Sequence, residues 1–175
     1  MIQDKIKAAI RDVKDFPKEG ILFKDITPIL EDSRLCSEIV DEFVKQLLDT
    51  KINAIIGVES RGFLFGMLLA NKLGVPFIPV RKKGKLPYKT ISYKYDLEYG
   101  SAEVEMHVDT VKKNWNVLIH DDLLATGGTA MAAAELVKQE GANIAGFAFL
   151  IGLDFLNGKD VIKKYSSNIV SLVNY

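Results

Sequence analysis

The segment from Val117 to Ala130, VLIHDDLLATGGTA, is the feature that most constrains what this chain can fold into. An apolar strand ends here in two carboxylates, and a loop of small residues then opens into an alanine-rich helix. Backbone N–H groups of such a loop converge at the positive end of the helix, where threonine hydroxyls add hydrogen bonds. The segment lacks both the lysine of nucleoside-triphosphate loops and the three spaced glycines of dinucleotide folds. It therefore predicts a strand, loop and helix that bind a single phosphate group.

The two carboxylates, Asp121 and Asp122, lie one loop length before the glycines. Carboxylate oxygens accept hydrogen bonds from vicinal hydroxyls, and they also suit a position beside a metal ion that the ligand itself holds. A sugar phosphate would satisfy both halves of the segment. The competing interpretation is that the acids only cap a strand and the glycines only start a helix.

The rest of the chain alternates strands with helices from Asn53 onward, with short connectors between them. This order predicts an α/β fold with a mostly parallel sheet and helices on both faces. Such sheets bind ligands at the carboxyl ends of their strands, where strand order reverses, so we expect the chemistry after Val58, Val80 and His120. The predicted strands cover 53–58, 75–80, 115–120, 142–153 and 168–173, and the predicted helices cover 61–74, 128–141 and about 155–165.

The N-terminal region is less regular. Apolar residues at helical spacing predict a short helix over Ile2–Val13, and breakers predict a loop from Phe16 to about Pro28. Cys36 lies within a second helix and is expected to be a core residue. The apolar stripe of that helix, also expected to be core, comprises Leu35, Ile39, Val40, Phe43, Val44, Leu47 and Leu48.

The middle of the chain interrupts the alternation. Residues 81–90 are basic and aperiodic, with Gly84 and Pro87 as breakers. The stretches 90–100 and 101–108 then alternate polar and apolar residues, which predicts two antiparallel strands that can form a hood over a loop.

Composition bounds the class of protein. A length of 175 residues predicts one domain, and 48% hydrophobic with 26% charged residues predicts an ordinary packed core. The 23 basic residues balance the 23 acidic ones, so the protein has no net positive charge that would favour binding to nucleic acid. We find no signal peptide and no membrane-spanning run, and the single cysteine allows no intrachain disulfide. We expect a cytoplasmic protein with no nucleic-acid or membrane partner.

The Val117–Ala130 segment closely resembles the phosphoribosyl-diphosphate signature of the type I phosphoribosyltransferase family. Four more segments are similar to those of the adenine-specific members of the family, in the same order and spacing: 16–30, 57–66, 81–87 and 97–100. The resemblance implies one domain, 1–175, with the type I phosphoribosyltransferase fold: a central, mostly parallel sheet flanked by helices. Residues 1–30 would form an N-terminal helix and a base-binding hood segment, and residues 81–107 a flexible catalytic loop with antiparallel strands.

The resemblance also implies roles for individual residues. Arg61, where a strand meets a helix, would reach the anionic leaving group, and Glu98 would be the acid or base that shares a proton with the purine. Tyr99 would help to close a lid. The phosphoribose would be bound by Asp121, Asp122, Ala125, Thr126, Gly127, Gly128 and Thr129. The diphosphate would be bound by Glu59, Ser60, Arg61, Arg81, Lys82 and Lys85, and adenine by Leu22, Phe23, Lys24 and Leu153.

Taken without the resemblance, several of these residues have simpler interpretations. Glu59 and Arg61 would form an ion pair at the surface, and the basic residues of 81–85 would be exposed to solvent without forming a binding site. Phe23 would be a core residue, and Glu98 an exposed carboxylate on a strand.

The reaction that the resemblance implies is purine salvage: adenine and 5-phospho-α-D-ribose 1-diphosphate give AMP and diphosphate. Mg²⁺ would be carried by the diphosphate and the ribose, with no metal held by the protein alone, and the protein would be a homodimer. A phosphoribosyltransferase for xanthine or a 6-oxopurine is one alternative. A regulator that senses phosphoribosyl diphosphate is another, but only about 15 residues precede FPKEG, too few for a DNA-binding domain.

The sequence departs from the family pattern at three positions. Lys24 stands where the family often has Arg, His120 where it usually has an apolar residue, and Gly152 where an acid is common. These departures bear on the packing beneath the acids and on how the purine edge is read. His107 and His120 have no cysteine or further histidine nearby, so the pattern does not indicate a zinc site.

Overall fold

The computed structural model describes residues 1–97 and 100–175 of the chain. Its helices are α1 (Ile2–Ala9), α2 (Thr27–Leu30), α3 (Ser33–Gln46), α4 (Gly62–Leu73), α5 (Gly128–Gln139) and α6 (Gly158–Ile162), with a 3-10 turn η1 (Asp154–Leu156). Its strands are β1 (Arg11–Lys14), β2 (Leu22–Asp25), β3 (Ala54–Val58), β4 (Phe77–Lys82), β5 (Thr90–Asp96), β6 (Ser101–His107), β7 (Asn116–Leu124), β8 (Asn143–Gly152) and β9 (Ile169–Asn174).

Seven of the strands in the described ranges form one sheet in the order β5-β6-β4-β3-β7-β8-β9. Strands β4, β3, β7, β8 and β9 are parallel, and β6 and β5 continue the sheet in antiparallel pairings. The α/β class and the mostly parallel sheet are therefore confirmed. Strand order reverses at β3, which lies between β4 and β7, so the loops after β3 and β7 open at the switch point.

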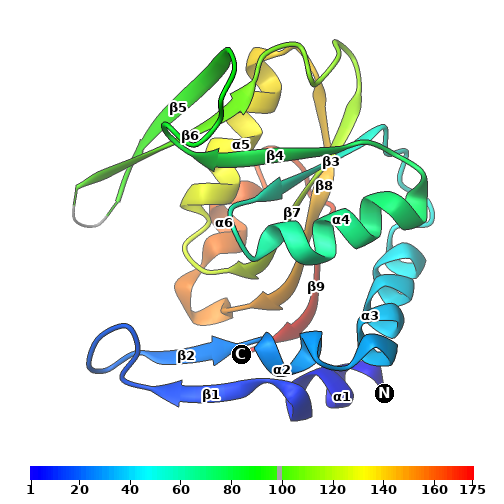
Figure 1. Cartoon of the computed structure of the whole chain (residues 1–175), viewed down its shortest axis with the longest axis vertical. Helices are drawn as coiled ribbons and strands as arrows, with labels where there is room; N and C mark the ends of the chain where they lie inside the picture. Colours follow the sequence, from blue (N-terminus) through cyan, green and yellow to red (C-terminus); the bar gives the residue numbers. More distant parts are fainter. Residues whose placement is uncertain (98–99) are drawn as a thin grey trace.

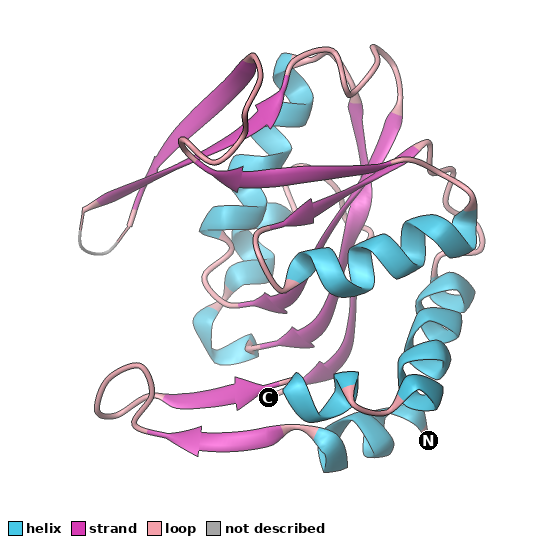
Figure 2. Ribbon diagram, in the orientation of Figure 1, coloured by secondary structure: helices cyan, strands magenta, loops and turns pink. Residues whose placement is uncertain are grey.

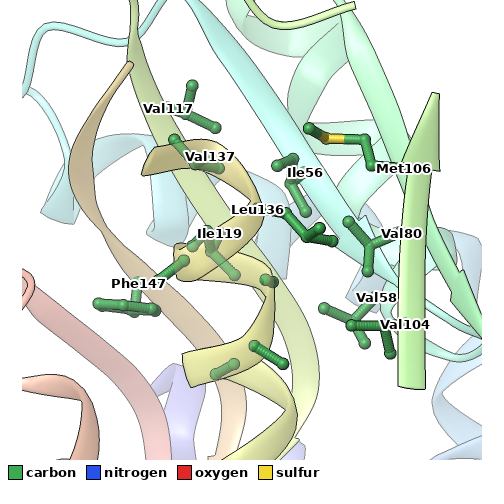
Figure 3. Close-up of a cluster of buried hydrophobic side chains, with 14 of the residues drawn as sticks. Ile56, Val58, Val80, Val104, Met106, Val117, Ile119, Leu136, Val137 and Phe147 are labelled. Atoms are coloured by element: carbon green, nitrogen blue, oxygen red, sulfur yellow. The ribbon is translucent and has the colours of Figure 1, made fainter. Parts of the chain in front are cut away.

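Helices cover both faces of the sheet and enclose two apolar clusters. On one face, α5 packs over β3, β7 and the β5–β6 pair, with Leu136 and Val137 against Ile56 and Ile119 (Figure 3). On the other face, α1, α3 and α4 cover Ile55 and Leu118. Full burial of such side chains contributes about 1.5–3 kcal/mol each, and this burial holds the strand ends in place.

Local signals explain where α3 begins and where α4 ends. Asp32 caps α3 by accepting hydrogen bonds from the Arg34 and Leu35 amides, both at 3.0 Å. Gly74 ends α4 at φ 67°, a left-handed conformation that favours glycine. The predicted stripe of α3 is confirmed except at Leu48, which lies beyond the helix and is 72% exposed.

The N-terminal prediction was wrong in two places. The first helix ends at Ala9 instead of continuing to Val13, and the predicted loop contains strand β2. Val13 pairs with Phe23 in the antiparallel β1–β2 sheet. Helical spacing in the sequence did not reveal this partner, because cross-strand pairing depends on residues ten positions away.

Two further details differ from the sequence reading. Cys36 is only half-buried, although burial raises the pKa of its thiol, and its Sγ donates to the Ile29 carbonyl. Strand β7 does not end before the acid pair but continues to Leu124, since it pairs with β8 as far as Gly152.

The two antiparallel units lie on the same side of the molecule (Figure 1). The β1–β2 hairpin and the β5–β6 pair flank the side toward which the parallel strands point their carboxyl ends, and Figure 2 shows α3 on the opposite side of the molecule. The loops after β3 and β7 are therefore flanked by two ribbons. Within the described residues, no helix has the length and apolar character needed to span a membrane.

Candidate active site

The acid pair lies near the end of β7, between β3 and β8. Asp122 is buried at 4% exposure, and its amide donates to Asp121 Oδ1 at 2.8 Å. Burial, followed by the neighbouring Asp122 carboxylate, raises the pKa of Asp121 well above its usual value. Burial also raises the pKa of Asp122, although Arg61 opposes this shift. The pair thus favours partners that donate hydrogen bonds, such as vicinal hydroxyls.

The loop that follows is fixed by close packing. Gly127 has φ 83°, and a Cβ there would lie 2.7 Å from the Gly158 carbonyl oxygen at the start of α6. A Cβ on Gly158 would in turn lie 2.2 Å from the Ala125 carbonyl oxygen. Helix α5 then starts at Gly128 without a side-chain cap, so the amides of its first turn can bind an anion.

Tyr95 of β5 contacts this loop, a role that the sequence reading missed. Its hydroxyl lies 3.1 Å from Thr129 Oγ1, and its ring lies under Gly128. A cavity of about 420 Å³ adjoins this contact and is also lined by Glu59, Arg81 and Asp121. The alternation of β5 was visible in the sequence, but the face turned toward the phosphate loop was decided by strand pairing.

Arg61 joins the two halves of the site. Its Nε lies 3.0 Å from Asp122 Oδ2, and its Nη1 donates to the Lys24 carbonyl at 3.5 Å. Its guanidinium carbon lies 4.8 Å from the centre of the Phe23 ring, a cation–π distance. The structure therefore brings together a predicted catalytic residue, a predicted ribose ligand and the β1–β2 hairpin, which contains three of the predicted adenine residues.

Glu59 gathers the predicted diphosphate ligands around one carboxylate. It accepts hydrogen bonds from Lys85 Nζ at 2.8 Å, from the Lys82 amide at 2.9 Å, and from Arg81 Nε and Nη2 at 3.3 and 3.2 Å. Burial by itself would raise the pKa of Glu59, but these hydrogen bonds outweigh it and lower the pKa to about 2. The simpler interpretation of the sequence, an ion pair between Glu59 and Arg61, is therefore wrong about the partner. Glu59 pairs with Arg81 and Lys85, and Arg61 pairs with Asp122.

Ser60 lies in the same β3–α4 loop. Its carbonyl accepts a hydrogen bond from the Phe63 amide at 3.1 Å, which starts α4. Lys82 lines the 420 Å³ cavity. All six predicted diphosphate residues are thus located at the carboxyl ends of β3 and β4.

The predicted adenine residues come from two separate segments. Leu22 is exposed, and Phe23 packs edge-on against Phe16 with ring centres 5.0 Å apart. Lys24 Nζ contacts Asp12 Oδ1 at 2.6 Å and lies 3.9 Å from the centre of the Tyr175 ring.

Tyr175 connects this hairpin to the segment that contains Leu153. The Tyr175 amide donates to the Gly152 carbonyl at 3.0 Å, and its carbonyl accepts from Asp154 at 2.9 Å. Leu153 lies beside the end of β7, where its amide donates to the Leu124 carbonyl. The two segments therefore meet through Tyr175, which no motif in the sequence marked.

Two departures from the family pattern have a packing explanation. His120 is fully buried, and its ring packs edge-on against Phe43. Burial lowers the pKa of His120 to about 4, and the nearby Ala148 backbone has a smaller effect in the opposite direction. Among the described residues, neither of its ring nitrogens has a partner with regular hydrogen-bond geometry. A Cβ at Gly152 would lie 2.4 Å from Asn174 Oδ1, so an acid would not fit there unless Asn174 moved.

The predicted base Glu98 and lid residue Tyr99 lie outside the described residues. Elsewhere in the chain, no three His, Cys, Asp or Glu side chains gather as a metal site would require. The expectation of no zinc site stays a prediction, as do the roles assigned to the individual site residues.

Comparison with known proteins places this geometry in a family. The model of the phosphoribosyl transferase domain matches residues 28–174. Adenine phosphoribosyltransferase from Cytophaga hutchinsonii is 50% identical over 175 residues, which cover 100% of this chain and 97% of that protein. The chain belongs to the adenine phosphoribosyltransferases. The resemblance seen in the sequence is therefore confirmed, and so is the fold that it implied.

Solved adenine phosphoribosyltransferase structures agree over nearly the whole chain. The enzyme from Thermoanaerobacter pseudethanolicus has a TM-score of 0.95 at 47% identity and covers 99% of both chains. The Saccharomyces cerevisiae enzyme, in complex with adenine and D-2,5-dideoxy-2,5-imino-altritol 1,6-bisphosphate, has a TM-score of 0.91 at 41% identity and covers 98% of both.

Proposed function

We propose that this chain transfers the 5-phosphoribosyl group of phosphoribosyl diphosphate to adenine, forming AMP and diphosphate. The observation that carries the proposal is the position of Arg61, which contacts both the ribose acid Asp122 and the base hairpin at Phe23 and Lys24. A sugar and a base held at these two places would meet across Arg61. The yeast relative, whose structure contains adenine together with a bisphosphate, supports the same pairing of ligands.

The sugar phosphate would lie on the β7–α5 loop. Amides of Thr126, Gly127, Gly128 and Thr129 would bind the 5-phosphate at the positive end of α5. Asp121 and Asp122 would accept hydrogen bonds from the ribose hydroxyls, and Ala125 would line the loop. Fixing the sugar in this way orients C1′ toward the incoming nitrogen, which lowers the entropic part of the barrier.

The leaving group would lie over the β3–α4 loop. Arg61, Arg81, Lys82 and Lys85 would take up the negative charge that develops on diphosphate as the bond to C1′ breaks. Ser60 lies between Glu59 and Arg61 and would add a hydrogen bond. Glu59 would not bind diphosphate directly as a carboxylate; it holds Arg81 and Lys85 in position before the anion arrives.

The base would lie under the β1–β2 hairpin. Phe23 would stack on the purine, the backbones of Leu22 and Lys24 would read its edge, and Leu153 would close the opposite face. Glu98 would share the proton on the purine imidazole as N9 attacks C1′, and Tyr99 would help to close the lid. Closing residues 81–100 over the site would exclude water, which otherwise competes with adenine as acceptor.

Mg²⁺ fits this site as an ion carried by the substrate. Asp122 Oδ2 is buried and lies 3.0 Å from Arg61 Nε, an ion-pair contact without regular hydrogen-bond geometry, and Asp121 lies beside it. Mg²⁺ is commonly bound through one or two carboxylates together with substrate phosphates and water, and not by a cage of protein ligands alone. Bound to diphosphate and ribose hydroxyls next to these acids, Mg²⁺ would neutralise charge on the leaving group.

We also propose that the protein is a homodimer. Helix α4 exposes an apolar stripe of Leu64, Met67 and Leu68, at 42%, 52% and 46% exposure. These residues follow Arg61 on the same helix, so a partner on this stripe would lie next to the leaving-group loop. Sedimentation analysis of Met67→Asp should give a monomer if the stripe is the interface.

The single cysteine, which is free, suits the reducing cytoplasm.

The test of the function is a direct assay. Purified protein with phosphoribosyl diphosphate and Mg²⁺ is given adenine, hypoxanthine, guanine or xanthine, and nucleotide and diphosphate are followed. We expect AMP from adenine alone, and strongly reduced rates for Glu98→Gln and Asp122→Asn. Product from an oxopurine would overturn the base assignment, and ligand binding without any product would favour a regulator instead.

A further inference from the structure

Glu105, on β6, is a buried carboxylate to which the sequence assigned no role. It is 2% exposed, and an ionised carboxylate at such a position is unfavourable unless it is well hydrogen-bonded. Its Oε1 accepts from the Lys85 amide at 3.0 Å and the Leu86 amide at 2.9 Å, and its Oε2 accepts from Thr90 Oγ1 at 3.2 Å. All three donors belong to the segment that joins β4 to β5 or to its end.

The balance of these contacts keeps Glu105 charged. Burial by itself would raise the pKa of Glu105, but hydrogen bonds from the Leu86 and Lys85 amides and from Thr90 lower it below its usual value. A charged acceptor makes stronger hydrogen bonds to backbone amides than a neutral one does. Glu105 therefore anchors the backbone of the basic loop to the sheet.

Lys85 is held at three points as a result. Its amide contacts Glu105, its carbonyl accepts from Arg81 Nη1 at 3.2 Å, and its Nζ contacts Glu59 at 2.8 Å. Strand register also brings Glu105 close to this segment, because Glu105 lies directly opposite Arg81 in the β4–β6 pair. The position of both cations thus depends on the backbone that Glu105 fixes.

We propose that Glu105 is a positioning residue for diphosphate recognition: it fixes the Lys85–Leu86 backbone so that Lys85 and Arg81 face the β3–α4 loop. Its carboxylate acts through the loop and does not touch the substrate, since both of its oxygens are occupied by loop donors. The inference rests on the proposed function, in which these cations bind the leaving group.

The experiment measures diphosphate binding and turnover separately. Glu105→Leu keeps an apolar side chain of similar size but removes the acceptor. Calorimetry with inorganic diphosphate and Mg²⁺, and the KM for phosphoribosyl diphosphate, should both show a loss of roughly 10- to 100-fold. The KM for adenine should change by less than about twofold. Glu105→Gln retains one acceptor oxygen for the two amides and should restore diphosphate binding to within about threefold of the wild type.

A matched control separates positioning from general damage. Glu140 also accepts a backbone hydrogen bond, from Asp109 at 3.1 Å, but it lies at the end of α5 away from the site, so Glu140→Leu should leave both KM values unchanged. If Glu105→Leu does not fold by circular dichroism, Glu105→Asp decides the question. Its shorter side chain withdraws the acceptor from the amides while keeping the charge, and the same split between the two KM values is expected.

Several outcomes would overturn the role of Glu105. These are an equal rise in both KM values, unchanged diphosphate binding in Glu105→Leu, or a Glu105→Gln variant as weak as Glu105→Leu. Failure of the proposed function gives a different result, because the wild-type protein would then form no AMP from adenine whatever stands at position 105. Binding of diphosphate is measured without turnover, so it reports on Glu105 in either case.

Discussion

On the leaving-group side of the site Glu59 contacts Arg81 and Lys85, whereas on the base side Phe23 and Lys24 depend on Arg61 and Tyr175. The first side consists of charges that are already paired around the buried Glu59 side chain, at strand ends of the seven-stranded sheet that the described residues form. The second consists of a two-stranded hairpin held by aromatic and cation–π contacts.

This difference indicates what each side contributes. Cations held by a carboxylate are preorganised, so an incoming anion exchanges partners with little rearrangement of the loop. A two-stranded hairpin is marginally stable by itself, and cation–π contacts contribute about 0.5–2 kcal/mol each. Substitutions on the leaving-group side should therefore weaken anion binding, and those on the base side should change the placement of the purine.

Arg61→Ala should have the largest effect, because Arg61 is the contact that both sides share. Loss of its charge near the leaving group should lower kcat/KM roughly 10²- to 10³-fold, the cost typical of one preorganised donor. Steady-state kinetics with both substrates varied would measure this. Arg34→Ala, on the exposed surface of α3, is the control and should be neutral. A loss below tenfold would show that the two sides act independently.

His120→Leu tests the layer beneath the acids on which both sides rest. The pKa of His120 is about 4 in the folded protein and 6.5 in a free side chain, so the unfolded state binds more protons between these values. Its contribution to stability is present above pH 6.5 and is lost as pH falls toward 4. As the pH falls over that window, the free energy of unfolding of the wild type should decrease by roughly 3 kcal/mol more than that of the variant.

Urea unfolding at pH 7.5, 6.5, 5.5 and 4.5 would measure the pH effect. The shifted carboxyls of Asp121 and Asp122 are present in both proteins, so their contribution largely cancels in the difference. Parallel pH profiles for the wild type and the variant would contradict a buried, neutral His120.

Lys85→Met should affect the leaving-group side alone. The side chain of Lys85 is half-exposed, so the KM for phosphoribosyl diphosphate should rise by only about tenfold, with the adenine KM unchanged. Lys45→Met, on the surface of α3, is the matched control. An equal rise in the adenine KM would break the proposed separation of the two sides.

Tyr175→Ala should have the smallest effect and should fall on the base side. Loss of the cation–π contact with Lys24 should raise the KM for adenine by roughly three- to tenfold, with little change for phosphoribosyl diphosphate. Tyr175→Phe keeps the ring and should behave like the wild type. If Tyr175→Phe is as impaired as Tyr175→Ala, the hydroxyl and not the ring supports the hairpin.

Local pattern was sufficient for the elements whose signals lie within one short segment. The strand, loop and helix of Val117–Ala130, the helix ended by Gly74 and the antiparallel β5–β6 pair all follow from periodicity, glycines and small loop residues. The alternation of strands and helices also predicted that the residues after Val58 and Val80 follow strand ends, where the structure has Glu59, Arg61 and Lys85. Each of these features is determined by neighbours along the chain.

Tertiary structure decided the features whose partners are distant in the sequence. Val13 becomes a strand residue because Phe23 pairs with it, and a side chain at Gly152 would have to displace Asn174, which lies against it. Arg61 is directed to Asp122, and Glu105 to Lys85, by the order of the strands. A carboxylate or an arginine has no periodicity that reveals its partner; only the packed sheet brings together residues that are far apart in the chain.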